Sequence, residues 1–425
     1  TLKLSNNKVQ GSIPPTIGQL TLLEELWLYN NALRGQLPSE VGLLTNLKSL
    51  NVIINYFDHT LPTEIGTLSR LQNLHLSYNA MTGSIPSEIG NLISLDHLYL
   101  DNNRFSAAVP NELGNLARLN KMNLNNNVLS GKIPSELGRL DFLVSLDLDY
   151  NEFEGEFPSE IGSIPFLRVL SCNANLISAL PTELMQLTRL TYLGVAYNLL
   201  QGTIPSKISG MTALETLVLS GNKITGPIPS EIGELHSTLE LVDFSVNYLW
   251  YSLPSEFARL TKLGALHLSN NFLAGAIPSE LGMLSSLIDL NLWDNLFSGY
   301  LPTELGLLEN VKIFDACLNT LSGAIPPQIG SMVNLERLSL SSNDLTSSVP
   351  TDFASLSKLR GLFLNDNPML SGSLPIEVMS LPDLEVLAIQ DTGLSGTLVP
   401  SVCDIRALNF TCSGTLCGCR CDCRE

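Results

Sequence analysis

The chain repeats one pattern of apolar and polar positions along most of its length. From Leu143 to Pro158 it reads Leu-x-x-Leu-x-Leu-x-x-Asn-x-Phe-x-Gly-x-Phe-Pro, and Leu335 to Asn343 repeats the first half of this string. The asparagine returns every 24 residues from Asn7 to Asn175 and, with two one-residue slips, continues to Asn367. A seventeenth copy has Thr392 in this position. A period of this length predicts a solenoid in which each copy forms one coil.

Each part of the repeat predicts a short element. The Leu-x-Leu alternation indicates a strand with one inward face, and the strand of the next repeat should lie parallel to it at about 4.8 Å. The Gly-x-Ile-Pro segment predicts a second short strand. The Pro-Ser-Glu or Pro-Thr-Glu that follows indicates a short helix or 3₁₀ turn, with Ser or Thr as its N-cap and an acidic residue favoured at its N-terminal end.

The repeated asparagine lies where the chain leaves the first strand. A buried amide there needs partners for its donors and its acceptor, and we expect these to be backbone groups of its own and neighbouring turns. The sequence therefore predicts a ladder of amides through the coils. Its members are Asn31, Asn55, Asn79, Asn103, Asn127, Asn151, Asn175, Asn198, Asn222, Asn247, Asn271, Asn295, Asn319, Asn343 and Asn367.

The repeat resembles a known family. The string from Leu263 to Pro278, Leu-x-x-Leu-x-Leu-x-x-Asn-x-Leu-x-Gly-x-Ile-Pro, is similar to the plant-type leucine-rich repeat of receptor-kinase ectodomains and polygalacturonase-inhibiting proteins. The Ile-Pro-Ser-Glu-Ile-Gly phrasing and the cysteine-dense tail look closer still to leucine-rich repeat proteins of diatoms and related algae. The resemblance covers residues 1 to about 400 and implies an α/β repeat fold. This fold is a right-handed solenoid with a concave parallel sheet, short second strands, and short helices or 3₁₀ turns on its convex side.

The same resemblance implies a non-enzymatic extracellular recognition module, like a receptor ectodomain, that binds a protein or glycan on the concave sheet. The alternative is a structural or adhesive component of an extracellular or cell-surface assembly, which would use flanks and ends for homo- or hetero-assembly. The sequence matches no specific ligand-contact motif of the family, so no binding residue is carried over. It also does not identify the ligand.

Residues 401–425 have the composition of a C-terminal cap. The six cysteines Cys403, Cys412, Cys417, Cys419, Cys421 and Cys423 lie within them. Such crowding is typical of two or three disulfides in a secreted protein, although the pairing stays open. A metal site is the alternative, but no C-x-x-C spacing or ligand histidine accompanies the cysteines, so we favour disulfides. Asn409 begins a glycosylation sequon, which agrees with export.

The start of the chain and the two remaining cysteines add two expectations. Leu2 already belongs to a strand, so we expect an N-terminal cap in a longer precursor. Cys172 occupies an inward apolar position. Cys317 falls on the concave face, where we expect partial burial between Trp293 and Ser341.

Charge and motifs exclude several function classes. The chain has 41 acidic and 23 basic residues, a formal net charge of −18, which argues against nucleic acid or an anionic membrane surface as a partner. No apolar run reaches the roughly 18 residues that a membrane-spanning helix needs. No phosphate-binding, metalloprotease, serine-hydrolase or kinase signature is present, so we predict neither an enzyme nor a metal centre.

Equivalent strand positions of successive repeats form columns on the concave face, and many of them are Ser or Asn. We expect recognition residues where other residue types take these positions. Aromatic faces beside carboxylates and amides suit a sugar or a basic, partly apolar peptide, although some aromatic residues occur on any surface of this size. The candidates are Trp27, Tyr29, His75, His97, Tyr99, Asp101, Asp147 and Asp149 in one stretch, and His267, Asp289, Asn291, Trp293 and Asp315 in another.

Two further features lie outside the concave face. Trp250 and Tyr251 place two aromatic side chains on a flank, where they are candidates for lateral contact with another chain. Thirteen coils carry an acidic residue two positions after the proline, in most of them after Pro-Ser or Pro-Thr, while Lys207 and Gln328 interrupt the column. These acidic neighbours should repel at low salt. Helix-end stabilisation explains this column, and weak Ca²⁺ binding along it is the alternative cofactor prediction. The column contains Glu40, Glu64, Glu88, Glu112, Glu136, Glu160, Glu183, Glu231, Glu256, Glu280, Glu304, Asp352 and Glu377.

Overall fold

The computed structural model describes residues 1–396 and 407–409, the latter by their backbone alone. It divides into two compact units, residues 1–201 with 210–214, and residues 202–209 with 215–425. The boundary between the two units lies in the coil that begins at Asn198. The asparagine spacing departs from 24 residues on both sides of this coil: it is 23 residues up to Asn198 and 25 residues up to Asn247.

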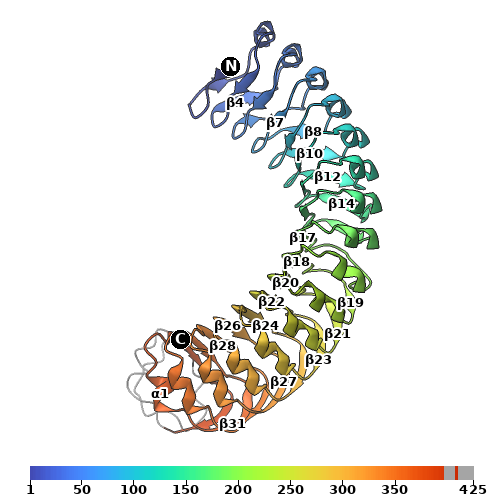
Figure 1. The fold of residues 1–425 in the computed structure, drawn as a ribbon. Helices are drawn as coiled ribbons and strands as arrows, with labels where there is room; N and C mark the ends of the chain where they lie inside the picture. The colour runs from blue at the N-terminus through green and yellow to red at the C-terminus, as the bar shows by residue number, and fades with distance from the viewer. Residues whose placement is uncertain (397–406, 410–425) are drawn as a thin grey trace. The chain divides into compact units, whose positions relative to one another are not determined.

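Each unit has an inner sheet of short parallel strands, one per coil, on the inner side of its curve, with the 3₁₀ helices on the outer side (Figure 1). The inner strands of the first unit are β1 (Leu2–Lys3), β3 (Glu25–Trp27), β5 (Ser49–Asn51), β7 (Asn73–His75), β9 (His97–Tyr99), β11 (Lys121–Asn123), β13 (Ser145–Asp147), β15 (Val169–Ser171) and β17 (Tyr192–Gly194). Those of the second unit are β18 (Thr216–Val218), β20 (Leu241–Asp243), β22 (Ala265–His267), β24 (Asp289–Asn291), β26 (Ile313–Asp315), β28 (Arg337–Ser339), β30 (Gly361–Phe363), β32 (Val386–Ala388) and β34 (Ala407–Asn409).

A second short strand follows the ladder position in most coils. In the first unit these are β2 (Gln10–Gly11), β4 (Ala32–Gly35), β6 (Tyr56–Phe57), β8 (Thr82–Gly83), β10 (Arg104–Ala107), β12 (Val128–Gly131), β14 (Glu152–Glu156) and β16 (Leu176–Ala179). In the second unit they are β19 (Thr225–Gly226), β21 (Tyr248–Tyr251), β23 (Phe272–Gly275), β25 (Leu296–Gly299), β27 (Thr320–Ala324), β29 (Asp344–Thr346), β31 (Asn367–Ser373) and β33 (Thr392–Ser395).

The outer side of the coils carries five- or six-residue 3₁₀ helices and one short α-helix, as the sequence predicted. The 3₁₀ helices are η1 (Pro15–Gln19), η2 (Ser39–Leu43), η3 (Thr63–Thr67), η4 (Ser87–Asn91), η5 (Asn111–Asn115), η6 (Ser135–Arg139), η7 (Ser159–Ser163), η8 (Thr182–Gln186), η9 (Ser206–Gly210), η10 (Ser230–Leu235), η11 (Ser255–Arg259), η12 (Ser279–Met283), η13 (Thr303–Leu307), η14 (Pro327–Ser331) and η15 (Thr351–Ser355). The α-helix is α1 (Ile376–Met379).

The strand β34 lies within the range that the sequence assigned to the cap. Its residues Ala407, Leu408 and Asn409 pair in register with Val386, Leu387 and Ala388 of β32. The inner sheet therefore extends past residue 400. The six C-terminal cysteines lie outside the described residues, as does the side chain of Asn409.

The N-cap prediction for the outer turns was wrong. In η6 the capping residue is Pro134, in extended conformation with φ −63°, and the structure gives it no side-chain capping bond. Ser135 is already the first helical residue, and its hydroxyl donates to Oε2 of Glu136 at 3.4 Å instead. The proline holds an extended backbone and accepts the first 3₁₀ hydrogen bond through its carbonyl, from the N–H of Leu137 at 3.2 Å, so no hydroxyl acceptor is required.

The core is formed by the apolar positions of the repeat. Leu146, the middle residue of β13, is fully buried, and its neighbours Ser145 and Asp147 are only half-buried because alternate residues of a strand face opposite sides. Phe105 and Phe153, two residues after their ladder asparagines, are also fully buried. The strand positions around each inward leucine are thus left to form the face of the sheet.

Candidate functional site

Strand register brings the predicted recognition residues of the first unit into one column. Trp27 pairs with Asn51, which pairs with His75, and His75 pairs with Tyr99. The column continues through Asn123, Asp147 and Ser171 in the same register. Because the strands are three residues long and locked by backbone pairing, these side chains occupy fixed places on the inner sheet.

An aromatic cluster forms on this column around Tyr99. Its ring meets the edge of His75 at a centroid distance of 4.7 Å and stacks on His97 at 6.0 Å. Burial, reinforced by repulsion from His97, lowers the pKa of His75 to about 4. Burial and the charge of Asp101 raise the pKa of Tyr99. His75 and Tyr99 are therefore uncharged aromatic rings at neutral pH.

The carboxylates of the first unit already have partners within the chain. Asp101, 6% exposed, accepts hydrogen bonds from the Ser77 hydroxyl at 2.5 Å and from the Asn102 amide at 2.9 Å. Asp149 accepts from the hydroxyl of Ser171 and from both nitrogens of Asn173. These two acids order the loops that follow the strands, so they support the site more than they meet a ligand.

Asp147 is hydrogen-bonded as well, since its Oδ1 accepts from the backbone N–H of Asp149 at 3.2 Å. Its Oδ2 accepts from the Asn125 amide at 2.8 Å, and burial raises its pKa, with the nearby Asp149 adding to this effect. The half-buried Trp27 lies further along the column, with the Lys3 ammonium 3.7 Å from its ring centroid and its indole N–H donating to Ser49. Trp27 lies two coil steps of about 5 Å each from His75 of the Tyr99 cluster, so the two are neighbouring subsites of one face.

The second unit places its candidates on the inner sheet of its own coils. The register pairs His267 with Asn291 and Asn291 with Asp315. Trp293 lies two residues beyond Asn291, and its backbone N–H donates a hydrogen bond to the side-chain oxygen of Asn291 at 3.1 Å. Nε2 of His267 lies 3.1 Å from Oδ2 of Asp289. The hydrogen-bonding carboxylate of Asp289 raises the pKa of His267.

Sequence reasoning missed two residues beside this group. Arg337 places its guanidinium 3.9 Å from Oδ2 of Asp315 and 4.6 Å from the ring of Phe363. Both residues belong to the strand positions from which the other candidates were read. Arg337 is neither aromatic nor acidic, and Phe363 lies two coils beyond Asp315. Cys317 is half-buried as expected, and burial together with Asp315 raises the pKa of its thiol to about 11. Cys172 is fully buried.

The predicted lateral contact residues form an exposed aromatic pair. Trp250 and Tyr251 stack at a centroid distance of 4.2 Å, and 45% and 59% of their surfaces are exposed. Tyr251 has a left-handed backbone, φ 74°. One coil step brings Tyr248 and Phe272 together in a second stack, at 6.1 Å.

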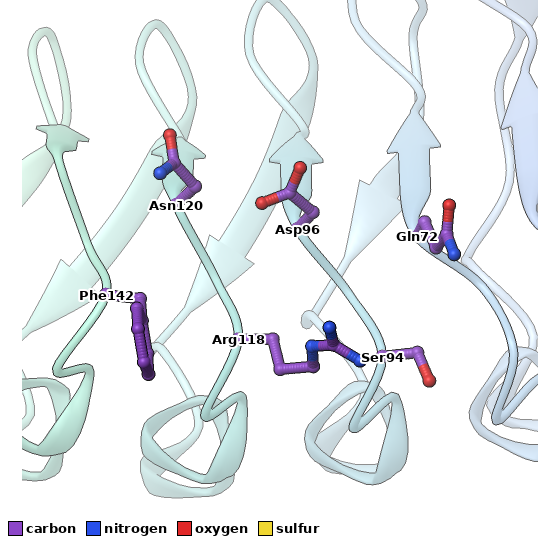
Figure 2. A pocket seen from close by; sticks show the side chains of 6 residues that line it. All are labelled: Gln72, Ser94, Asp96, Arg118, Asn120 and Phe142. Carbon is purple, nitrogen blue, oxygen red and sulfur yellow. The ribbon is translucent and has the colours of Figure 1, made fainter.

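A second surface of the first unit escaped sequence analysis. Two adjoining cavities of about 430 and 250 Å³ lie along the residues that lead into the inner strands. Figure 2 shows the larger, where Arg118 and Phe142 come from neighbouring coils and Asp96 and Asn120 lie at the start of their strands. We call the two cavities together the flank groove. Its lining residues stand seven and nine positions before the ladder asparagine, and a comparison of those two columns would have revealed it.

The described residues offer neither a metal site nor a membrane-spanning helix. They contain no group of three or more His, Cys, Asp or Glu side chains placed to hold a metal ion. Among them, no helix combines the length and apolar character needed to cross a bilayer.

The chain matches leucine-rich repeat family models in several segments. A family model described as leucine-rich repeat region matches residues 53–156, and two further leucine-rich repeat models match residues 165–224 and residues 1–20 and 334–356. No curated protein sequence matches the chain significantly.

Three solved structures illustrate the likeness. The plant peptide hormone receptor RGFR1 in complex with RGF2 is 31% identical, with a TM-score of 0.84, over 96% of this chain and 70% of that one. The Arabidopsis receptor kinase HAESA, in complex with the peptide hormone IDA and the co-receptor SERK1, is 31% identical, with a TM-score of 0.73, over 96% and 77%. The Leptospira interrogans LRR protein LIC12759 is 32% identical, with a TM-score of 0.72, over 88% and 93%.

Proposed function

Because this chain belongs to the leucine-rich repeat proteins of the plant receptor type, we propose that its inner sheet binds an extracellular peptide or protein ligand. The observation that carries the proposal is the in-register column from Trp27 through Tyr99 to Asp147. Rigid aromatic side chains provide contact area at a low entropic cost, and half-buried ones are typical binding hot spots.

The chemistry of the column favours a basic, partly apolar ligand. The Tyr99 cluster offers an apolar surface, and Asp147, a few coils away, offers a carboxylate. The chain as a whole carries a net charge of −18, which attracts cationic partners over the range of the screening length. An extended peptide of about ten residues would cross seven coils. The proposal assigns binding and no catalysis to this chain, at the cell surface or outside the cell.

The full chain can be tested with a library of extended peptides in which basic, neutral and acidic sequences are equally represented. We expect basic peptides with apolar residues to be enriched, and Trp27→Ala or Tyr99→Ala to lower their affinity at least about tenfold. The flank variant Trp250→Ala is the matched control and should bind as the parent chain does. Selection of acidic peptides, binding that the inner variants do not weaken, or binding only to neutral glycans in a parallel array would contradict the proposal.

The adhesive alternative has one specific observation in its favour, the exposed Trp250–Tyr251 stack beside Tyr248 and Phe272. Contiguous exposed aromatic surface is typical of protein interfaces. If this surface mediates assembly, the full chain is oligomeric in analytical ultracentrifugation and Trp250→Ala returns it to a monomer. A monomeric parent chain would remove this second candidate.

A further inference from the structure

The flank groove carries positive charge on a strongly acidic protein. Among its lining residues Arg118, Arg168 and Arg189 are basic, and Asp96 is the single acid. All three arginines are exposed, and none has an ion-pair partner within residues 1–396. Asp96 already lies 3.1 Å from Nδ1 of His97. The guanidinium groups are therefore free to meet carboxylates, which they bind in bidentate geometry.

Two phenylalanines form the apolar part of the same groove. Phe142 and Phe166 are 58% and 39% exposed, and their rings stack at a centroid distance of 6.3 Å with an angle of 14°. The guanidinium of Arg189 lies 4.8 Å from the ring of Phe166. Exposed phenyl rings framed by arginines are the composition of an interface centre rather than of a solvated surface.

The arrangement favours a polypeptide over a sugar. Sugars stack on open ring faces, but Phe166 lies between the ring of Phe142 in the preceding coil and the guanidinium of Arg189 in the following one. The ring with more free surface is Phe142, 58% exposed, which suits an aliphatic side chain of a peptide. From Arg118 to Arg189 there are three coil steps of about 5 Å, which an extended segment of about five residues spans.

We infer that the flank groove binds an extended acidic segment of a partner protein, running across the coils with an apolar side chain against Phe142 and Phe166 and its carboxylates on Arg118, Arg168 and Arg189. This surface is separate from the inner sheet and takes a ligand of the opposite charge. A protein that binds a basic ligand on its sheet thus has a second contact for an acidic one.

Fluorescence anisotropy with the full chain tests the inference. The probes are three labelled pentapeptides of equal length, Glu-Leu-Glu-Leu-Glu, its glutamine analogue and its lysine analogue. We expect the acidic peptide to bind at least about tenfold more tightly than the other two, and more weakly as salt is added. The double variant R168A/R189A should reduce this preference at least about fivefold, and the single variant Phe166→Ala should weaken binding of the acidic peptide at least about fivefold.

Two matched controls separate the groove from general charge or stickiness. Phe272→Ala removes one ring of an exposed stacked pair that has no arginine contact among the described residues, and Arg104→Ala removes one exposed charge elsewhere in the first unit. Both should bind the acidic peptide as the parent chain does, and so should Trp27→Ala, whose effect belongs to the inner sheet.

Three results would overturn the inference. They are equal binding of the glutamine analogue, unchanged binding by R168A/R189A, and binding of dextran sulfate at the groove without binding of the acidic peptide. The last result would assign the groove to an anionic polysaccharide. A failure of the inner-sheet variants in the library experiment has no bearing on these outcomes, so the two proposals are tested independently.

Discussion

The side-chain amide of Asn151 donates a hydrogen bond to the carbonyl oxygen of Leu124, one coil earlier, at 3.0 Å. The same nitrogen donates to Leu148 and Asp149 of its own coil, and its oxygen accepts from the N–H of Leu129 at 3.0 Å. Asn151 is 9% exposed. One amide thus satisfies backbone groups in two coils, and the pattern recurs at Asn127 and Asn271. The ladder predicted from the sequence is confirmed.

Asn151→Leu should lower the free energy of unfolding by about 1–3 kcal/mol, because it leaves buried backbone groups of both coils without partners. Urea denaturation followed by circular dichroism measures the change. Asn115→Leu, at the exposed end of η5, is the control and should stay close to the parent chain. Equal effects of the two substitutions would mean that the ladder does not stabilise the stack.

Gly114→Ala should also destabilise the protein. An added Cβ at Gly114 would lie 2.4 Å from the carbonyl oxygen of Glu136 in the next coil. Relief requires a backbone shift, so we expect a loss of about 1–3 kcal/mol in the same denaturation experiment. At Gly264 an added Cβ would have its nearest neighbour at 3.6 Å. Gly264→Ala should therefore be nearly neutral, and a comparable loss there would refute the stacking argument.

Ile54→Asn should stabilise the protein by about 1 kcal/mol. Ile54 immediately precedes a ladder asparagine and has a left-handed backbone, φ 55°, which is unfavourable for a β-branched residue. Asn30 and Asn102 hold the same position with nearly the same φ. Half of the Ile54 surface is exposed, so little packing is lost. The comparison variant is Ile93→Asn, which is exposed without a left-handed backbone and should give no gain in the urea midpoint.

The pH dependence of stability should contain a contribution from His75. Its folded pKa of about 4 lies below its ordinary value of 6.5, so the unfolded chain takes up a proton before the folded chain does. The contribution of His75 to the free energy of unfolding is therefore complete above about pH 6.5 and is lost as the pH falls toward about 4. His75→Gln should flatten this slope in urea midpoints measured at several pH values. An unchanged slope would contradict the burial of a neutral imidazole.

His267→Gln should act in the opposite sense. The folded pKa of His267 is raised by Asp289, so this residue contributes stability below its unfolded pKa that is lost as the pH rises through the folded one. The substitution should therefore lower the urea midpoint at mildly acidic pH and leave it unchanged at alkaline pH. A loss of equal size at both ends of the range would point to packing rather than charge.

The response of the acid column to added ions distinguishes mutual charge repulsion from calcium binding. If its charges act by mutual repulsion, sodium chloride raises the melting temperature, and calcium chloride at equal ionic strength does no more. If the column coordinates calcium, micromolar to millimolar calcium raises the melting temperature and a chelator reverses the effect. The described residues favour screening, since each carboxylate of the column, such as Glu136 in η6, stands on a separate coil.

The sequence by itself determined the repeated elements. The spacing of Leu143, Leu146 and Leu148 before Asn151 fixes which side chains face inward, and the period fixes which residues share a column. These features could be predicted because neighbouring coils are related by a constant step, so register follows from counting. The same counting placed Trp27, His75, Tyr99 and Asp147 on one face.

Only the tertiary structure decided what those side chains contact. It engaged Asp101 and Asp149 in hydrogen bonds that order loops, assigned the capping role to Pro134, and placed the ring of Phe166 between Phe142 and Arg189. These outcomes depend on rotamers, on the left-handed residue before each ladder asparagine, and on the close approach of Gly114 to Glu136. Such contacts form between residues about 24 positions apart in the sequence, and they depend on atomic positions to less than about 1 Å. A pattern of residue types carries no information at that scale.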